Sequence, residues 1–541
     1  GDSRESREQG IGIVHTCDPT QPMSSRSPML VAPPTLDILD LDLLLCICEH
    51  LPARGLARLK CVSHRYSVAD TAAELASSRR HDGWRVAARD GESAIFRLFV
   101  CERLLAPLPV VSATRFHGLV VTAGGGLSAF GSNADFQLGL TDDPGSDLEP
   151  ELDEDDQELE FGCADPRRAD VVAPRPIERL AGRTVVAASA GWAHSAALTN
   201  DGRLLTWGSY GERLGLGVDQ GVVGPPCEVS SFPPETRVAL VAAGVHDTLC
   251  VTANGDLYSW GETALGHAED EDGAGPSQDW VGAEPVRVDA LAARRVVSID
   301  HKDGLAIAVT SAGKLFLFCA GWNLPPPVFH YLNPTPAPVP FSGVLVRDAS
   351  CSSGHVAAVA SDGRLFTWGE GAEGKLGHGD EEDVMTPRVV SRLQGRPVGL
   401  VSCGTLHTAA TTDGGSVLWT WGSGSFGCLG HGSEENRLEP TEVVLDGFGT
   451  DMVIQGGVIV EDNRGDDSAV EHVEIVALSC GCFTTMIVDT VSGRLASMGW
   501  CHAGQLGLGA QVEGLEFTWQ PLAVLDVRPE VAPHAQSESG R

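Results

Sequence analysis

The stretch "DGRLLTWGSYGERLGLG", which runs from Asp201 to Gly217, decides the fold of this chain. It is too apolar for a solvent-exposed loop and too rich in glycine for a helix. Nearly the same phrase returns as "DGRLFTWGEGAEGKLGHG" between Asp362 and Gly379. A phrase that recurs within one chain indicates a repeated building unit, so the repeat is analysed before any motif is assigned a chemistry.

The core of the phrase, "L-x-x-W-G", occurs seven times, in some places degraded. The closing glycines are separated by 77, 53, 60, 48, 53 and 77 residues, so the basic period is about fifty and the two long intervals carry insertions. The seven versions are "LSAFG" (127–131), "LLTWG" (204–208), "LYSWG" (257–261), "LFLFCAG" (315–321), "LFTWG" (365–369), "LWTWG" (418–422) and "LASMG" (495–499).

Each unit contains further shared features around this core. Upstream lies a strand of small residues with a glycine and often a histidine, as in "GWAHSAALT" (191–199), followed by a glycine turn. Downstream come a second glycine turn, such as "RLGLG" (213–217), and a Pro-bounded strand. Four short strands per unit, with Gly and aromatic residues at fixed places, are typical of a β-propeller blade. The sequence therefore predicts a mainly β fold, a seven-bladed β-propeller over residues 109–527.

Three details of this propeller are expected from the sequence. The Trp and the flanking Leu of each phrase should pack between neighbouring sheets. The segments "VVSATRF" (110–116) and "PLAVLDV" (521–527) should share one sheet and close the ring, which would remove exposed edges. The two long intervals should hold an acidic insertion at 141–170 and a second insertion at 447–473.

The repeat resembles that of the regulator of chromosome condensation family, whose units read roughly "GxxHTxAL…DGxxxxWGxNxxGQLGxG". The resemblance covers about residues 109–527. The fourth unit departs from it, because it lacks the glycine-leucine turn and a matching His, and the seventh has "GCFT" where the His is expected. We expect these two blades to be distorted. The resemblance also implies an alternative function, guanine-nucleotide exchange on a small GTPase, although this sequence shows no identifiable wedge for that mechanism.

A different pattern precedes the propeller. Leu41, Leu44, Leu45 and Cys48 have the i, i+3, i+4, i+7 spacing of one apolar helix face, and Pro52 ends that helix. We therefore predict small helices over residues 35–66 and a helical linker over 67–108. Residues 1–34 and 528–541 are expected to be disordered tails. Helices this few cannot bury their own apolar surface, so they dock on the propeller or present a face to another protein.

Residues 35–66 resemble an F-box, the module that binds the Skp1 adaptor of cullin-RING ubiquitin ligases. Two positions depart from the family pattern: Asp40 stands in place of the proline and Tyr66 in place of the Trp. The alternative interpretation is a helical hairpin that docks on the propeller. The resemblance implies a partner-binding face made of Leu39, Leu43, Leu44, Ile47, Leu51, Leu56, Leu59, Val62 and Tyr66.

Composition excludes several function classes. The net charge of −35 argues against a nucleic-acid-binding surface, since phosphate contacts need clustered Lys and Arg. The 15 cysteines include no CxxC pair, so neither zinc nor a disulfide framework is indicated, as expected in the cytoplasm or nucleus. No apolar run approaches the ~20 residues of a membrane span, and no signal peptide is evident. We therefore expect an intracellular protein without a membrane partner.

The insertion "TDDPGSDLEPELDEDDQELE" (141–160) carries eleven carboxylates and no basic residue. It should be disordered through self-repulsion. One interpretation is a tether for a basic protein, such as a histone-like surface. The other is a solvated loop without a partner.

The motifs that suggest a reaction or a cofactor have simpler explanations. His117, His194, His355 and His407 recur at matching places, but equivalent positions in a propeller lie too far apart to share one metal ion. We expect them to hydrogen-bond backbone turns inside their own blades. "GSGSFG" (422–427) matches a dinucleotide-binding pattern, yet no helix follows it, so it is interpreted as a turn. A light-sensing role would need Trp residues clustered on one face, whereas most Trp residues here belong to the buried phrase.

The sequence thus predicts a non-enzymatic adaptor with no catalytic, cofactor-binding or metal-binding residues. The helical box would recruit a Skp1-like adaptor, and the propeller would hold an unidentified protein substrate. The alternative remains a regulator of a small GTPase, and what distinguishes the two is the box, for which an exchange factor has no use.

Overall fold

A computed structural model of the 541-residue chain describes residues 110–140, 170–217, 221–263, 265–267, 282–319, 334–352, 354–445, 452–455, 458–461, 474–489, 494–509 and 517–526. The helices predicted for residues 35–66 and 67–108, and both tails, lie outside these ranges. In the described part of the chain, every helix is a short 3-10 turn. No helix there is long and apolar enough to cross a bilayer.

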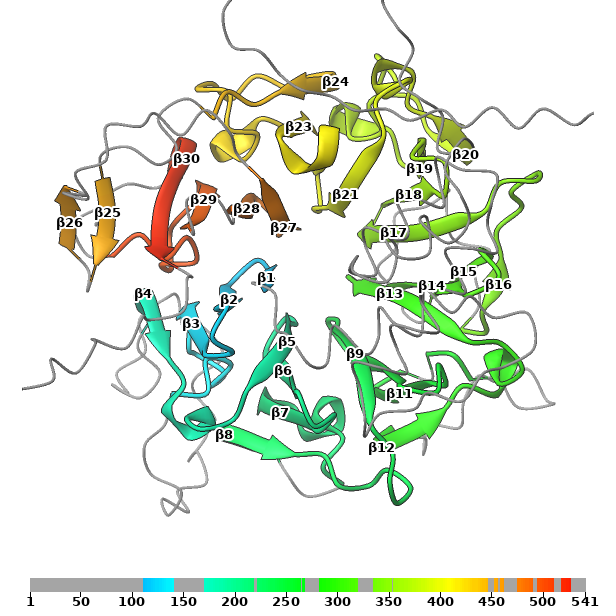
Figure 1. Ribbon diagram of the computed structural model, residues 1–541, viewed down its shortest axis with the longest axis vertical. Coiled ribbons are helices and arrows are strands. Elements are labelled where there is room, and N and C mark those ends of the chain that lie inside the picture. The colour runs from blue at the N-terminus through cyan, green and yellow to red at the C-terminus, as the bar shows by residue number, and fades with distance from the viewer. Residues whose placement is uncertain are drawn as a thin grey trace, which may run out of the picture.

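Seven antiparallel four-stranded sheets surround a central axis like the blades of a propeller (Figure 1), which confirms the predicted architecture. Blades 1 to 3 are β1 (Val110–Ala113), β2 (His117–Val121), β3 (Leu127–Gly131) and β4 (Val171–Pro176); β5 (Val185–Ala190), β6 (His194–Thr199), β7 (Leu204–Ser209) and β8 (Val222–Glu228); and β9 (Val238–Ala243), β10 (Asp247–Thr252), β11 (Leu257–Gly261) and β12 (Gly282–Arg287).

Blades 4 and 5 are β13 (Val296–Lys302), β14 (Leu305–Thr310), β15 (Leu315–Cys319) and β16 (Ala337–Pro338), then β17 (Val346–Ser352), β18 (His355–Ala360), β19 (Leu365–Gly369) and β20 (Val384–Val389). Blades 6 and 7 are β21 (Val398–Cys403), β22 (His407–Thr412), β23 (Val417–Gly422) and β24 (Arg437–Glu442), then β27 (Ile475–Cys480), β28 (Thr484–Asp489), β29 (Arg494–Trp500) and β30 (Phe517–Asp526). Within the second predicted insertion, β25 (Met452–Gln455) and β26 (Val458–Glu461) form a separate hairpin beside β30 (Figure 1).

Short 3-10 turns punctuate the connections between these strands. They are η4 (Glu178–Leu180), η5 (Gly211–Leu214), η6 (Asp289–Leu291), η7 (Ala372–Gly374), η8 (Ser391–Leu393), η9 (Asp413–Gly415) and η10 (Ser425–Gly427). The motif "GSGSFG" therefore forms the end of β23 followed by η10, in agreement with its interpretation as a turn.

Strand pairing defines two faces of the ring. In blade 2, His194 of the second strand lies opposite Gly208 of the third, and Gly208 lies opposite Val223 of the fourth. The connections from first to second strand and from third to fourth strand therefore lie at one end of the sheet. We call this end of the ring the AB face and the opposite end the BC face.

In blades 2, 3 and 6, the recurring Trp joins the blade to the preceding one. Trp207 is fully buried, and its indole Nε1–H donates to the carbonyl oxygen of Gln137 in blade 1 at 2.8 Å. Beside it, Gly139 has φ of +68°, and a Cβ there would lie 2.8 Å from the indole nitrogen of Trp207. The same bond recurs from Trp260 to Arg213 and from Trp421 to Lys375. Within the opening phrase, the Trp therefore contacts the preceding blade, and the glycine turn receives the Trp of the following blade.

Among the four repeated histidines, only His117 bonds to a turn of its own blade, where the Thr114 hydroxyl lies 3.3 Å from its Nδ1 atom. The expectation of bonds to backbone turns within each blade was therefore wrong. Each one instead reaches a side-chain hydroxyl in the next blade, at 2.7 to 2.9 Å from its Nε2 atom. The hydroxyl in turn donates to a carbonyl oxygen in or next to the 3-10 or glycine turn of the first blade, for example from Thr248 to Arg213. The four pairs are His117–Ser195, His194–Thr248, His355–Thr408 and His407–Thr485.

The prediction that both ends of the propeller share one sheet was also wrong. β1 belongs to the sheet of blade 1 and β30 to the sheet of blade 7. The ring closes by packing instead, since Val111 and Phe130 of blade 1 share a core with Met486 and Val488 of blade 7. The backbone N–H of Ala113 also donates to the hydroxyl of Ser479 across this seam, at 2.9 Å.

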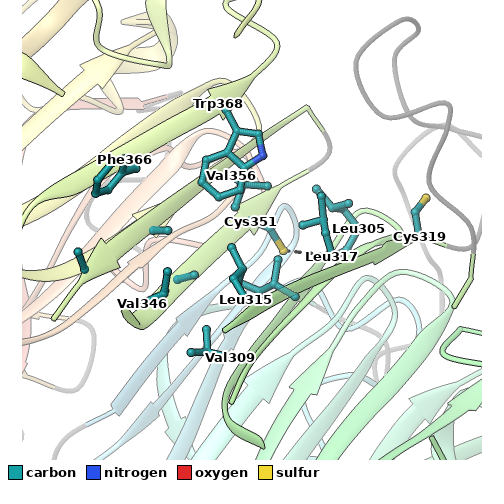
Figure 2. Close-up of a cluster of buried hydrophobic side chains, with 14 residues drawn as sticks. Leu305, Val309, Leu315, Leu317, Cys319, Val346, Cys351, Val356, Phe366 and Trp368 are labelled. Carbon is teal, nitrogen blue, oxygen red and sulfur yellow. Dashed lines mark hydrogen bonds between the residues drawn. The ribbon is translucent and has the colours of Figure 1, made fainter. Parts of the chain in front are cut away.

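Blade 4 is the irregular member of the ring. Its fourth strand, β16, has only two residues, and Leu305 stands where blades 1, 2, 5 and 6 have His. Figure 2 shows how apolar side chains replace the hydrogen bond: Leu305, Leu315 and Leu317 face Cys351, Val356 and Trp368 of blade 5. Blade 7, where Thr484 occupies the His position, is a complete four-stranded sheet. The expected distortion thus appears in blade 4 and not in blade 7.

Candidate partner-binding face

The residues predicted to bind Skp1, from Leu39 to Tyr66, all lie outside the described residues, and that prediction stays open. Within the described part of the chain, the AB face gathers the side chains with features of a binding site. Aromatic side chains are concentrated there, where first-to-second and third-to-fourth strand connections meet. We define the aromatic arc as Phe116, Trp192, Tyr210, Phe426, Phe483 and Trp500.

The aromatic arc follows four consecutive blades. Phe426 comes from blade 6, Phe483 and Trp500 from blade 7, Phe116 from blade 1, and Trp192 with Tyr210 from blade 2. In Figure 1 these blades lie next to one another around the ring. Edge-to-face contacts join Phe426 to Phe483 between blades 6 and 7, with ring centroids 5.0 Å apart, and Phe116 to Trp192 between blades 1 and 2, with centroids 4.9 Å apart.

Parts of the aromatic arc remain accessible. Trp192 is 37% exposed and Tyr210 is 50% exposed, whereas the Trp residues of the repeated phrase are buried. Tyr210 and Phe426 adopt positive φ angles of 65° and 58°, a conformation unfavourable for bulky residues. Backbone strain of this kind persists where the surrounding structure demands it and is common at functional sites.

Two arginines of the chain already lie against the aromatic arc. The guanidinium carbon of Arg115 lies 5.4 Å from the ring centroid of Phe116 and 5.7 Å from that of Trp192. That of Arg213 lies 4.1 Å from the ring of Tyr210. These are cation–π distances, so the arc provides surfaces on which a guanidinium group is stabilised.

An ionised cluster continues the arc onto blade 3. The side chain of Arg213 donates to Glu262, with 2.7 Å between Nε and Oε1, and Nδ1 of His246 lies 2.9 Å from the other carboxylate oxygen. Burial of Glu262 works in the opposite direction, but the hydrogen bond from His246 and the Arg213 charge hold its pKa below the ordinary value. Behind this cluster, Asp247 occupies the His position of blade 3, and burial raises its pKa to about 7.

The AB face is acidic next to the arc. We define the acidic rim as eight carboxylates in the third-to-fourth strand connections of blades 5 and 6. Asn436 of blade 6 donates to Glu373 of blade 5, which ties the two connections together. The backbone N–H of Phe426 donates to Glu434 at 3.3 Å, so the rim and the arc meet. The rim consists of Glu370, Glu373, Asp380, Glu381, Glu382, Asp383, Glu434 and Glu435.

The acidic insertion leaves and re-enters the propeller on this same face. It joins the third and fourth strands of blade 1, between Leu140 and Asp170. Burial raises the pKa of Asp170, although hydrogen bonds from Ser132 and Asn133 and the nearby His502 oppose that shift. Because the ring of His502 lies 5.8 Å from that of Trp500, Asp170 and His502 lie beside the aromatic arc.

The part of the AB face nearest the central axis is built from polar contacts between the first strands of neighbouring blades. Backbone N–H groups of one blade donate to a hydroxyl of the preceding one, as from Cys403 to Ser350 and from Cys480 to Ser402. Lys302 of blade 4 crosses the ring and donates to the carbonyl oxygens of Cys403 and Cys480, each at 2.8 Å. These contacts use the channel residues for structure, which leaves the arc and rim as the surface available for binding.

The chemistry of this face is that of recognition. The described residues contain no group of three His, Cys, Asp or Glu side chains able to hold a metal ion. The histidines between blades are buried, and burial lowers the pKa of His117, His194 and His407 to about 3, so they stay neutral. Exposed aromatic rings, two stacked guanidinium groups and a carboxylate rim instead suit a protein ligand.

The sequence interpretation missed the aromatic arc, although a signal was present. Phe116 directly precedes His117, Phe483 directly precedes Thr484, and Trp192 lies two residues before His194. An aromatic residue just before the His position thus recurs in three blades that are neighbours in the ring.

Comparisons with known proteins agree with the repeat. The family model described as "RCC1-like domain" matches residues 154–534. The human E3 ubiquitin-protein ligase HERC2 is 29% identical over 365 residues, which are 64% of this chain and 7% of HERC2. The Ultraviolet-B receptor UVR8 of Arabidopsis thaliana is 29% identical over 283 residues, 51% of this chain and 56% of UVR8. The chain therefore spans less than two thirds of either relative.

Solved structures share the fold at low identity. Prp20p of Saccharomyces cerevisiae, described together with its binding to Gsp1p and histones, has a TM-score of 0.56 at 17% identity, with 78% of this chain and 88% of that chain covered. Human WBSCR16 has a TM-score of 0.54 at 21% identity, with 68% and 88% covered. Both likenesses concern the propeller alone.

Proposed function

This chain belongs to the RCC1-like domain family, and from that premise we propose that it is a protein-interaction module that works without catalysis. Its propeller holds a protein partner on the AB face, through the aromatic arc. The observation that carries this proposal is the exposure of Trp192 and Tyr210 on a face where aromatic rings contact one another between blades 6 and 7 and between blades 1 and 2. Exposed aromatic clusters of this kind provide the anchors of protein interfaces.

The second half of the proposal concerns the segment before the propeller. Residues 35–66 recruit a Skp1-like adaptor through the apolar positions around Leu44 and Ile47, so that the partner on the propeller becomes a ubiquitin-ligase substrate. The gapless match of these positions to the F-box pattern supports this assignment. A chain with both partners acts in the cytoplasm or nucleus.

Affinity purification of the full chain tests both halves. The wild type is compared with Leu44→Asp/Ile47→Asp, with Trp192→Ala/Phe483→Ala, and with Met385→Ala/Val444→Ala as a control at exposed apolar residues outside the arc. We expect the first variant to lose Skp1 and cullin, because two buried carboxylates disrupt an apolar interface. The second should keep Skp1 and lose the propeller's partner, and the control should keep both.

The contrary results are equally specific. If the wild type captures no Skp1, the helices serve internal packing and the adaptor role fails. If it then accelerates nucleotide release from small GTPases, the exchange-factor function replaces it. If the arc variant captures the same partner as the wild type, the AB face is not the binding surface.

A further inference from the structure

We propose that the AB face binds a basic protein segment rich in Arg and Lys, whose cationic side chains lie on the aromatic arc while the acidic rim neutralises their charge. This inference rests on the proposed function, in which the AB face holds a protein partner, and it names the class of that partner.

The first step is the behaviour of the chain's own cations. The guanidinium group of Arg115 lies over both Phe116 and Trp192, and that of Arg213 lies over Tyr210 while it pairs with Glu262. In each case an Arg side chain lies over an aromatic ring, and Arg213 also forms a salt bridge with the carboxylate of Glu262. The surface therefore shows, with its own residues, the contacts that a second Arg-rich chain would make.

The second step is the separation of charge between the two faces. In the described connections of the AB face, Arg115 is the one exposed basic side chain. The described connections of the BC face instead present many exposed arginines. These are Arg179, Arg183, Arg203, Arg237, Arg294, Arg364, Arg392 and Arg396. Several of these arginines pair with carboxylates of the same face, as Arg203 does with Asp201, Arg364 with Asp362 and Arg396 with Asp413. The described AB face therefore has the larger excess of negative charge, which favours it as the side on which a basic segment docks.

The third step is the continuity of negative charge with the arc. The acidic rim meets the arc where Phe426 bonds to Glu434. Asp170 of blade 1 interacts electrostatically with His502, whose ring lies 5.8 Å from that of Trp500. Carboxyl groups of the described chain thus lie near both Phe426 and Trp500. An acidic or neutral partner would find no matching charge here.

The test uses the full chain and a labelled synthetic peptide in which Arg alternates with Gly, with a Glu-Gly peptide as the reference. Binding is followed by fluorescence anisotropy at low and moderate ionic strength. We expect the Arg-Gly peptide to bind and its affinity to fall steeply with added salt, since exposed charges are screened over about 10 Å at 0.1 M salt. The Glu-Gly peptide should not bind.

Three variants locate the site. Trp192→Ala/Phe483→Ala should weaken binding about five- to tenfold through loss of cation–π contacts. Glu381→Gln/Glu382→Gln/Glu435→Gln, on the acidic rim, should weaken it about tenfold. The matched triple variant on exposed residues away from the AB face, Glu178→Gln/Glu235→Gln/Glu442→Gln, removes the same number of charges and should change affinity less than about twofold.

Several outcomes would overturn the inference. Equal losses in the two charge variants, or no loss in the aromatic variant, would mean unselective attraction to a polyanion. The same holds if neutralising the insertion alone abolished binding. If sedimentation shows that two copies of the chain associate through the arc, the occupant is a second copy. If the arc captures a partner in the affinity purification while the Arg-Gly peptide does not bind, this inference fails and the proposed function survives.

Discussion

At the scale of single residues, each interblade histidine is a neutral hydrogen-bond donor. The hydroxyl of Thr485 donates to the carbonyl of Cys428, so the bond between Thr485 and His407 must use the imidazole Nε2–H. The tautomer is thus set by the neighbouring blade. Because His407 is fully buried, its pKa falls to about 3, and the bond persists at neutral pH.

We expect His407→Phe to lower the free energy of unfolding by about 1–3 kcal/mol, because Thr485 loses a partner in a buried site. A double-mutant cycle with Thr485→Val, followed by urea denaturation, should give a coupling of at least about 0.5 kcal/mol. Ser231→Ala, at an exposed residue, is the control and should stay within about 0.5 kcal/mol of the wild type. If the two substitutions lowered the free energy of unfolding by strictly additive amounts, the bond between His407 and Thr485 would contribute nothing to stability.

At the scale of the structural element, the glycine that closes each "L-x-x-W-G" strand allows the close approach of two strands. Gly208 has φ of +120°, and a Cβ at this position would lie 2.4 Å from the carbonyl oxygen of Ala193. Gly182 also has a positive φ, of +83°, but no atom lies within 4 Å of its Cβ position. The two residues share the left-handed backbone and differ in steric space.

Comparing Gly182→Ala with Gly208→Ala separates these two effects. The first should cost about 1–2 kcal/mol, the price of a left-handed backbone for an L-residue. The second should cost at least twice as much, since the strand must also move away from Ala193. Thermal unfolding of both variants provides the measurement, and equal shifts of the midpoint would contradict the steric argument.

At the scale of the whole molecule, seams between blades make stability depend on pH. His117, His194, His301 and His407 have an ordinary pKa of 6.5 that burial lowers to about 3. Between these values the unfolded chain binds protons that the folded chain refuses, so stability is present above pH 6.5 and is lost as the pH falls. Asp247 acts in the opposite sense between pH 3.8 and about 7, because its pKa is raised.

The four histidines outnumber Asp247 and Asp170, the two carboxyl groups of the described chain whose pKa burial raises. We therefore expect the urea midpoint to decrease steadily from about pH 7 to pH 5. The wild type and His407→Phe are compared over this range. The variant should have a lower midpoint at pH 7 but a shallower pH dependence, since one of the titrating groups is gone. A midpoint that rises on acidification would mean that Asp247 and other carboxyl groups dominate.

Local pattern in the sequence determined the propeller and its seven blades. Three local features were enough for this prediction: the period of about fifty, the strand "LLTWG" and the glycine turns. Each of them lies within one repeat unit, so it can be recognised from the sequence without the tertiary structure. The burial of Trp207 between sheets was predictable for the same reason. The Skp1-binding face from Leu39 to Tyr66 remains a prediction from sequence.

Only the tertiary structure decided what crosses from one blade to another. The partner of His407 is Thr485, which lies 78 residues away in the chain, and no pattern near His407 in the sequence predicts this pairing. β1 and β30 stay in separate sheets because packing around Phe130 and Met486 closes the ring without a shared strand. The aromatic arc exists for the same physical reason: its residues belong to turns far apart in the chain, and ring closure brings blades 6, 7, 1 and 2 side by side.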